Sequence, residues 1–299
     1  MILTGILLAL SAGLLWNVSG IVNSTRARKN YDLYSYLLTN VVFSALFTGI
    51  LSGSPAGLFR WDLIRFLLVV MAAGAINTSG ALFLQKALQN GHHGIIFLIS
   101  QSAPAIPFIA GMLFLGDSPT FQKIGGVLLI LTGMVLAALP KLRKGESSSG
   151  IPLKKWLIPT LLSFCCFGIA HTMLVLPSLM ALPEGAQQFR TFLMYCGSSF
   201  LVISVTAGRF RSGKLEFNRM LLLIGVIAAA LNVCSMGIYF KAMDYLAEAQ
   251  AVGLGSPIAT SASLAGFTLY SWFYLREKRE LAALFGLICI CSGAVLASL

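Results

Sequence analysis

The stretch NTSGALFLQKAL, Asn77–Leu88, closes one long apolar run of the chain, and NVCSMGIYFKAM, Asn232–Met243, closes another. In both, an asparagine lies within the apolar run and a Lys-Ala pair begins nine residues after it. The two asparagines are 155 residues apart, and so are the two lysines, Lys86 and Lys241. The matched spacing predicts that one structural unit occurs twice in the chain.

The apolar runs themselves predict membrane-spanning helices. Hydrophobic residues make up 57% of the 299 residues and charged residues only 10%, with a mean hydropathy of +0.85, whereas soluble domains carry about 25% charged residues. Runs of about 20 apolar residues match the thickness of a bilayer core, and the backbone in lipid must satisfy its hydrogen bonds within each segment. The sequence therefore predicts an all-α polytopic membrane protein with ten transmembrane helices, at residues 2–22, 33–52, 63–86, 94–115, 123–139, 156–180, 188–207, 219–241, 250–274 and 281–298.

Further matched landmarks extend the repeat over both halves of the chain. Pro104 corresponds to Pro257 at an offset of 153, and LGDSPTFQKIGG at 115–126 aligns with LREKRELAALFG at 275–286 at an offset of 160. Residues 141–155 contain the charged and serine-rich sequence KLRKGESSSG and predict a basic linker. The predicted units are therefore residues 1–140 and 156–299, with five helices each. Because five is odd, the second unit enters the membrane from the opposite face, which makes an inverted repeat of the kind found in secondary transporters.

The net charge of +11 is explained by topology. Most of the 21 Lys and Arg residues fall in the odd-numbered loops between the predicted helices. The positive-inside rule then places these loops in the cytoplasm and both termini outside. The excess of basic residues thus indicates how the chain is oriented in a cell inner membrane, and no nucleic-acid partner is predicted.

The landmarks resemble those of the drug/metabolite transporter superfamily, in its ten-helix type with two EamA-like repeats. The resemblance rests on FLQKAL at 83–88, YFKAM at 239–243, the two matched prolines, and an acid followed by two glycines in each half. Those last residues are Asp117, Gly126 and Gly133 in the first half and Glu277, Gly286 and Gly293 in the second. The resemblance implies a small-molecule transporter, with an exporter favoured. It also implies a central cavity among the first four helices of each repeat, with the fifth helices packed together at the periphery.

Polar and aromatic residues inside the predicted helices are the candidate contacts of a transported solute. His171 is the one ionisable group predicted deep in the membrane, where it either binds a solute or hydrogen-bonds to a neighbouring helix. The two asparagines either bind a solute or lock helices together, and Trp16 either packs the core or offers a flat wall to a ligand. The full candidate set is Trp16, Asn17, Asn77, Ser100, Gln101, His171, Asn232, Tyr239 and Ser256.

The matched prolines and acids suggest mechanical roles. Pro104 and Pro257 lie within apolar runs, so each is expected to kink a helix and free a backbone carbonyl. Their recurrence near the predicted midplane favours hinges. Asp117 and Glu277 are expected to cap the helices that follow them, since carboxylates favour the positive end of a helix dipole.

The placement of the carboxylates narrows the class of solute. All ten Asp and Glu residues are predicted in loops or at helix ends, whereas exporters of lipophilic cations use an acid at membrane depth that exchanges a proton for the cation. The sequence therefore favours neutral or zwitterionic metabolites such as amino acids. A proton-coupled multidrug antiporter, an intramembrane enzyme and a non-transporting scaffold are the alternatives. An enzyme would need a nucleophile and a base together, and the sequence predicts no enzyme, no cofactor and no metal; it is compatible with a monomer or a homodimer.

Overall fold

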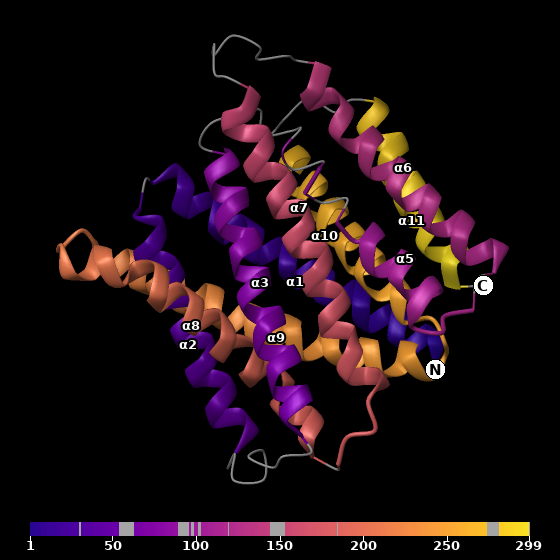
Figure 1. Ribbon diagram of the computed structural model, residues 1–299. Coiled ribbons are helices and arrows are strands. Elements are labelled where there is room, and N and C mark those ends of the chain that lie inside the picture. Colours follow the sequence, from indigo (N-terminus) through magenta and orange to yellow (C-terminus); the bar gives the residue numbers. More distant parts are fainter. Residues whose placement is uncertain are drawn as a thin grey trace.

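The computed structural model is an all-helical bundle (Figure 1). It describes residues 1–29, 31–53, 63–88, 96, 99–100, 103–118, 120–143, 153–183, 185–273 and 281–298. Gln101, Glu277 and most of the predicted linker lie outside these residues. Within the described residues, the regular elements are α-helices and short 3₁₀ turns.

Ten α-helices of the described residues follow the order of the ten predicted spans. In the first half they are α1 (Ile2–Arg28), α2 (Leu33–Ser52), α3 (Ile64–Leu88), α5 (Ala105–Phe114) and α6 (Phe121–Arg143). In the second half they are α7 (Leu153–Val175), α8 (Arg190–Arg211), α9 (Arg219–Glu248), α10 (Gly255–Phe273) and α11 (Leu281–Ser298), with 3₁₀ turns η3 (Leu176–Leu179), η4 (Ala186–Phe189) and η5 (Val252–Leu254). Among the described residues, six segments are long and apolar enough to cross a membrane: Ile2–Val22, Leu33–Ser52, Ile64–Ala87, Lys154–Leu179, Ala186–Arg211 and Arg219–Glu248.

Two helix boundaries differ from the prediction in ways that matter for function. The structure extends α9 to Glu248, seven residues beyond the predicted end at Lys241. The extension is stabilised by Ala242, Met243 and Leu246, which are fully buried. Lys241 is exposed, so its charged side chain reaches the surface without ending the helix. The span predicted at 250–274 is divided, because η5 precedes α10.

The side chains are distributed as a bilayer requires. Large apolar residues cover the outer surface of several helices, among them Leu3, Leu7, Phe200, Ile227 and Phe285. Polar side chains of α2 are buried instead: Ser35, Thr39, Asn40, Ser44 and Thr48. With lipid outside, polar groups are satisfied inside the bundle. The interior is therefore the place to look for a polar site.

The helices pack into two groups joined by α2. One group contains α1, α9 and α10, the other α3, α7 and α8, and α2 contacts both α8 and α9. Glycines allow backbones to touch within each group. A Cβ on Gly13 of α1 would lie 1.9 Å from the carbonyl oxygen of Ala259 in α10, and one on Gly74 of α3 would lie 1.9 Å from that of Met194 in α8. Any larger residue at these positions would force the helices apart.

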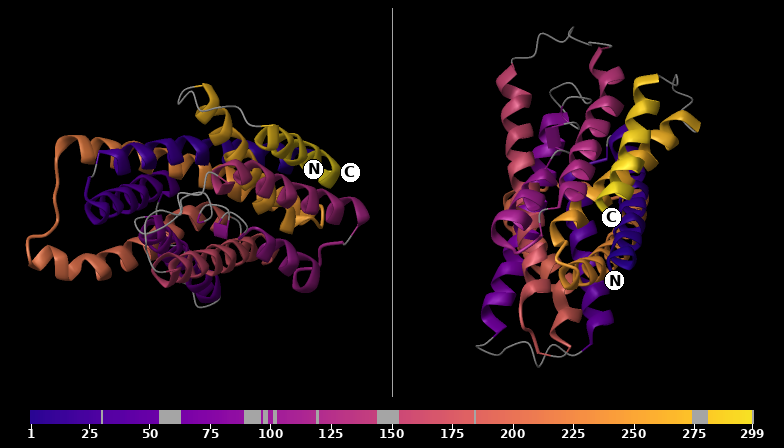
Figure 2. Two further views of the ribbon diagram at one scale, coloured as in Figure 1. Left: turned by 90° about the horizontal axis from the view of Figure 1, so that it is seen from above. Right: turned by 90° about the vertical axis from the view of Figure 1, so that its right-hand side faces the viewer.

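The helices α6 and α11 form a pair at the edge of the bundle (Figures 1 and 2). Their contact is reciprocal. A Cβ on Gly133 would lie 2.6 Å from the oxygen of Gly286, and one on Gly293 would lie 2.6 Å from the oxygen of Gly126. The packing of these two helices through the four glycines is confirmed.

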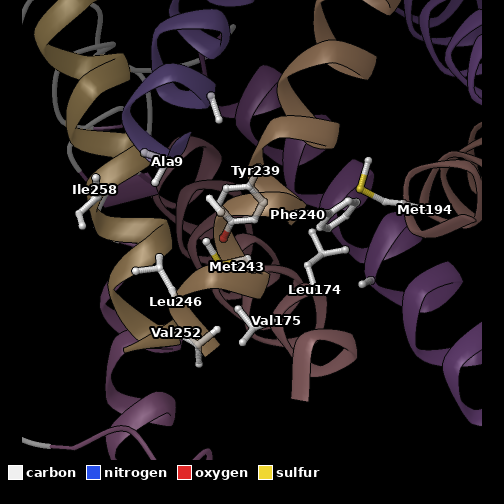
Figure 3. Close-up of a cluster of buried hydrophobic side chains, with 14 of the residues drawn as sticks. Ala9, Leu174, Val175, Met194, Tyr239, Phe240, Met243, Leu246, Val252 and Ile258 are labelled. Carbon is white, nitrogen blue, oxygen red and sulfur yellow. The ribbon is translucent and has the colours of Figure 1, made fainter. Parts of the chain in front are cut away.

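The largest cluster of buried side chains surrounds the C-terminal half of α9. Tyr239, Met243 and Leu246 are completely buried there. Figure 3 shows Phe240, the next residue after Tyr239, with Leu174 of α7 beside it. This part of α9 faces α1, α7 and α10, and it holds the candidate site.

Candidate functional site

Three aromatic side chains from three helices meet in the interior. The ring centroid of Trp16 in α1 lies 5.2 Å from that of Tyr239 in α9 and 5.9 Å from that of His171 in α7. The His171 and Tyr239 centroids are 6.2 Å apart, and all three ring pairs are tilted. Tilted rings at these separations attract each other through their quadrupoles. They make a flat-sided aromatic cluster between the two helix groups.

A hydroxyl from a fourth helix joins this cluster. The Ser256 Oγ atom in α10 lies 3.2 Å from His171 Nδ1 and 2.5 Å from the Tyr239 hydroxyl oxygen. Ser256 and Tyr239 are buried, whereas His171 and Trp16 are half-buried. The structure thus brings together four of the predicted site residues, Trp16, His171, Tyr239 and Ser256, and we call them the aromatic cluster.

Three of the predicted site residues have buried polar atoms that lack protein partners. Trp16 Nε1, Asn17 Oδ1 and Ser100 Oγ are buried and find no hydrogen-bond partner in the described part of the chain. An unsatisfied buried group costs about 1–3 kcal/mol, so such groups are rare without a function. Asn17 itself lies against α10, because a Cβ on Gly266 would be 2.6 Å from its Nδ2 atom. The interior therefore offers one donor, one acceptor and one hydroxyl to a solute.

The two repeated asparagines have different surroundings. Asn232 Oδ1 accepts a hydrogen bond from Ser19 Oγ at 3.0 Å, and its Nδ2 donates to Asn40 Oδ1 at 3.2 Å. Asn232 thereby joins α9 to α1 and α2, which matches the helix-locking alternative. Asn77 in α3 is half-buried and finds no hydrogen-bond partner within the residues that the structure describes. Of the two, Asn77 is the one with a free amide.

Both hinge candidates lie at the start of a helix. Pro104 is the N-cap of α5, and Pro257 is the third residue of α10. A proline in the first turn removes no helical hydrogen bond. The expectation that Pro104 frees the Ser100 carbonyl inside a continuous helix is wrong, since that oxygen accepts from the Ala103 N–H at 3.2 Å. At both prolines a helix starts where a kink within a continuous helix was expected. Hinge motion at Pro104 and Pro257 stays a prediction.

Asp117 caps a helix of the other half. Its Oδ1 accepts from Val252 N–H at 2.9 Å and its Oδ2 from Gly253 N–H at 2.6 Å, at the break that precedes α10. The expected cap on the following helix, α6, is therefore wrong. Lys123 supports the same junction by donating to the Gln250 carbonyl at 3.0 Å. Burial raises the pKa of Asp117, while the two N–H donors and Lys123 act in the opposite direction.

A buried ion pair next to the aromatic cluster was not predicted. Arg190, at the start of α8 and 1% exposed, places Nη1 2.6 Å from Asp244 Oδ1 in α9. Its Nη2 donates to the Leu174 carbonyl at 3.1 Å and to Ser178 Oγ at 2.8 Å. The guanidinium also stacks on Phe240, 4.5 Å from the ring centroid. The prediction missed the pair because it ended the span of α9 at Lys241; the apolar residues that follow this lysine were the available signal.

Arg26 occupies a comparable place at the opposite end of the bundle. Its Nη2 donates to Gln85 Oε1 of α3 at 2.8 Å, its Nη1 to the Tyr31 carbonyl at 3.3 Å, and its guanidinium lies 5.9 Å from the Tyr36 ring centroid. The ends are opposite because α1 and α9 are antiparallel: a Cβ on Gly5, near the start of α1, would touch Leu246, near the end of α9. Each arginine bridges the two helix groups. Within the described residues, Arg190 is paired directly with an acid, whereas Arg26 hydrogen-bonds to a neutral amide and interacts with Asp32 at longer range.

The apolar exterior, the helix-only architecture and the polar interior define a multi-pass membrane protein. The sequence profile of the EamA-like transporter family matches residues 3–139. The chain belongs to this family, within the drug/metabolite transporter superfamily, and the family is one of transporters rather than enzymes.

The fold is shared with a solved structure along nearly the whole chain. A crystal structure described only as that of a protein aligns with a TM-score of 0.71, at 17% identity, over 99% of this chain and 98% of the other. At this identity the likeness concerns the fold alone. A search of curated proteins found no match.

Proposed function

We propose that this transporter moves small neutral or zwitterionic metabolites, such as amino acids, across the cell inner membrane as an exporter or facilitator. The observation that carries the proposal is the aromatic cluster, where rings from α1, α7 and α9 meet Ser256 of α10 beside the unpaired Trp16 Nε1 atom. Binding sites for small solutes combine aromatic walls with a few convergent polar groups. A solute that accepts a hydrogen bond from Trp16 would remove the cost of the unpaired donor.

Alternating access would arise from two inverted five-helix units, residues 1–140 and 156–299, joined by the linker at 141–155. Two contact patterns support this arrangement. α1 packs on α9 as α3 packs on α7, and the α6–α11 glycine contacts are reciprocal. Each pattern has the two-fold character expected of an inverted repeat. The odd-numbered loops would face the cytoplasm, with both termini outside.

Each candidate residue has a distinct proposed part. Trp16, His171, Tyr239 and Ser256 would contact the solute directly. Asn17 and Ser100 would add hydrogen bonds from buried atoms without partners in the described chain, and Asn77 from its half-buried amide. Gln101 stays a candidate from the sequence. Asn232 would position α1 and α2 around the site through its bonds to Ser19 and Asn40. The helix breaks at Pro104 and Pro257 would act as hinges.

The experiment is a transport assay in proteoliposomes with the purified protein. Liposomes are loaded with a mixture of unlabelled amino acids and nucleobases, and the entry of each labelled solute is followed by counterflow. The proposal expects saturable entry of at least one solute, lost in His171→Ala, weakened several-fold in Ser256→Ala and retained in Ile227→Ala, a change on the exposed outer surface of α9. The absence of entry for every solute would refute it.

A proton-coupled multidrug antiporter is the second candidate, and Asp244 favours it. This carboxylate lies inside a segment long enough to span the membrane, although the sequence placed it beyond the span. Proton release driven by a quaternary ammonium in the same liposomes, and its loss in Asp244→Asn, would establish this alternative. Counterflow of neutral or zwitterionic solutes without proton movement would exclude it.

A further inference from the structure

The Arg190–Asp244 pair borders the aromatic cluster along two helices. Leu174, whose carbonyl binds Arg190, follows His171 by three residues, or ~4.5 Å of helix rise, and Asp244 follows Tyr239 by five residues, or ~7.5 Å. The Phe240 ring under the guanidinium lies 6.2 Å from the Tyr239 ring. The pair therefore closes one end of the space where the aromatic side chains meet. A solute held by those rings would direct its polar end toward the two charges.

Each member of the pair has one hydrogen-bonding atom without a partner in the described chain. Arg190 Nε is a buried donor that has no partner in the described chain. Asp244 uses Oδ1 for both Arg190 and Ser178, while Oδ2 has no hydrogen bond to any residue that the structure describes. The side chain of Asp244 is 39% exposed, so this second oxygen can be reached. One free cationic donor thus lies beside one free anionic acceptor.

We propose that Arg190 and Asp244 recognise the carboxylate and the ammonium group of an α-amino acid, and that they make zwitterions the preferred solutes. The inference rests on the transport function proposed above and narrows its solute class. Arg190 would bind the solute carboxylate through Nε and the guanidinium edge. Asp244 would accept hydrogen bonds from the solute ammonium group through Oδ2. Both are specificity-determining residues that the sequence reasoning did not include.

The energetics of buried charges explain why a zwitterion is selected. Separating the pair strands the Arg190 charge in a poorly solvated interior and leaves the partly exposed Asp244 without its partner, which is costly unless each charge gains a new partner. A zwitterion supplies both partners at once and adds no net charge. A simple amine satisfies only Asp244 and a simple carboxylic acid only Arg190, so either one leaves an unpaired charge. The same pair therefore disfavours solutes with a single charge.

The opposite end of the bundle provides the matched control. Arg26 is equally buried among helices, at 6% exposure, but its side-chain partner there is the neutral Gln85. Asp32 acts on Arg26 at longer range, but the described side-chain contact itself contains no carboxylate. Changes at Arg26 are therefore expected to affect the stability of the protein without changing its choice between zwitterions and singly charged solutes.

The test compares an amino acid with two analogues in thermal-shift titrations of the full-length protein. All twenty amino acids are screened, and each stabilising one is compared with the amine that lacks its carboxylate and the acid that lacks its ammonium group. The wild type is expected to bind the amino acid at least tenfold more tightly than either analogue. In Asp244→Asn, which keeps the oxygen that binds Arg190, the preference over the acid should fall to below threefold. In Arg190→Lys the preference over the amine should shrink, and in Arg26→Lys both preferences should persist.

The inference is overturned if no amino acid stabilises the protein, or if the wild type binds amino acid and analogues alike. It is also overturned if Asp244→Asn leaves both preferences unchanged. If Arg190→Lys does not fold, the result for Asp244→Asn alone tests the inference. Failure of the transport proposal has a different signature, because no solute of any class would then enter the proteoliposomes. A transported neutral solute that ignores both charged residues would leave the transport function intact and remove only the inference.

Discussion

Two polar groups on the same helix show that buried polar side chains have two different roles in this bundle. Asn232 and Tyr239 are seven residues apart on α9, about 10.5 Å of helix rise. Around Asn232, both ends of the amide have partners on neighbouring helices. Around Tyr239, the hydroxyl is bonded to Ser256 but the adjoining Trp16 keeps a buried donor without a partner. The difference separates a contact that holds helices together from a site that is completed by a ligand.

Replacing Asn232 by Leu should give the largest change in stability. The substitution leaves the Ser19 hydroxyl without its acceptor and removes one of the two donors to Asn40 Oδ1, the other being Ser44. An unsatisfied buried group costs about 1–3 kcal/mol. Thermal unfolding in detergent measures the loss. The half-saturation of transport should change less than twofold in the protein that folds. A tenfold weaker affinity with unchanged stability would reverse the roles assigned to the two sites.

Replacing Trp16 by Phe should give the reverse pattern. The ring contact with Tyr239 is retained, and no protein hydrogen bond is lost because Nε1 has none among the described residues. Solute affinity should fall about tenfold, equivalent to ~1.4 kcal/mol, with a thermal midpoint equal to or above that of the wild type. Counterflow and thermal unfolding on the same preparation measure both. Unchanged affinity would show that the indole N–H does not face the solute.

Replacing Ser256 by Ala should affect both properties moderately. His171 Nδ1 and the Tyr239 hydroxyl lose a shared partner, and the stability should fall by about 1 kcal/mol. The His171 ring also loses its orientation, so affinity should weaken several-fold. Ser235→Ala is a matched control, because Ser235 is a buried serine of the same region that bonds only to its own helix at the Asn232 carbonyl.

Replacing Asn77 by Ala should give the smallest change in stability, within about 0.5 kcal/mol, because its side chain makes no hydrogen bond within the described structure. The comparison with Asn232→Ala tests whether the repeated asparagines have diverged. Equal losses of stability in the two variants would contradict the difference between their surroundings.

The sequence predicted the order and character of the helices because hydropathy and length determine which segments enter a membrane. It also predicted that Trp16, His171, Tyr239 and Ser256 belong to one site, since polar and aromatic residues within apolar helices must face the interior. The pairing of α6 with α11 was implied by the family resemblance, and the two glycines of each helix are suited to it. These features depend on the hydropathy and spacing of residues within single helices, which the sequence shows directly.

Features that depend on a second helix could not be predicted in the same way. Pro104 and Pro257 predicted kinks within continuous helices, but the sequence did not show that each proline lies at the start of a helix. The partners of Asn232 lie more than 190 residues away in sequence, and those of Asp117 more than 130 residues away. Asp244 was placed in a loop because the span was assumed to end at Lys241, whereas α9 continues to Glu248 and the exposed Lys241 lies within it. A contact between Asp244 and Arg190 inside the bundle was therefore not predicted.

The most direct measurement follows the fluorescence of Trp16 while a solute binds. A variant with Trp61, Trp156 and Trp272 changed to Phe keeps Trp16 as the sole tryptophan, and it is titrated with the solute that enters proteoliposomes fastest. The account predicts a saturable change of emission whose half-saturation equals that of transport by the same variant. Saturable transport with unchanged Trp16 emission would place the solute elsewhere and contradict the account.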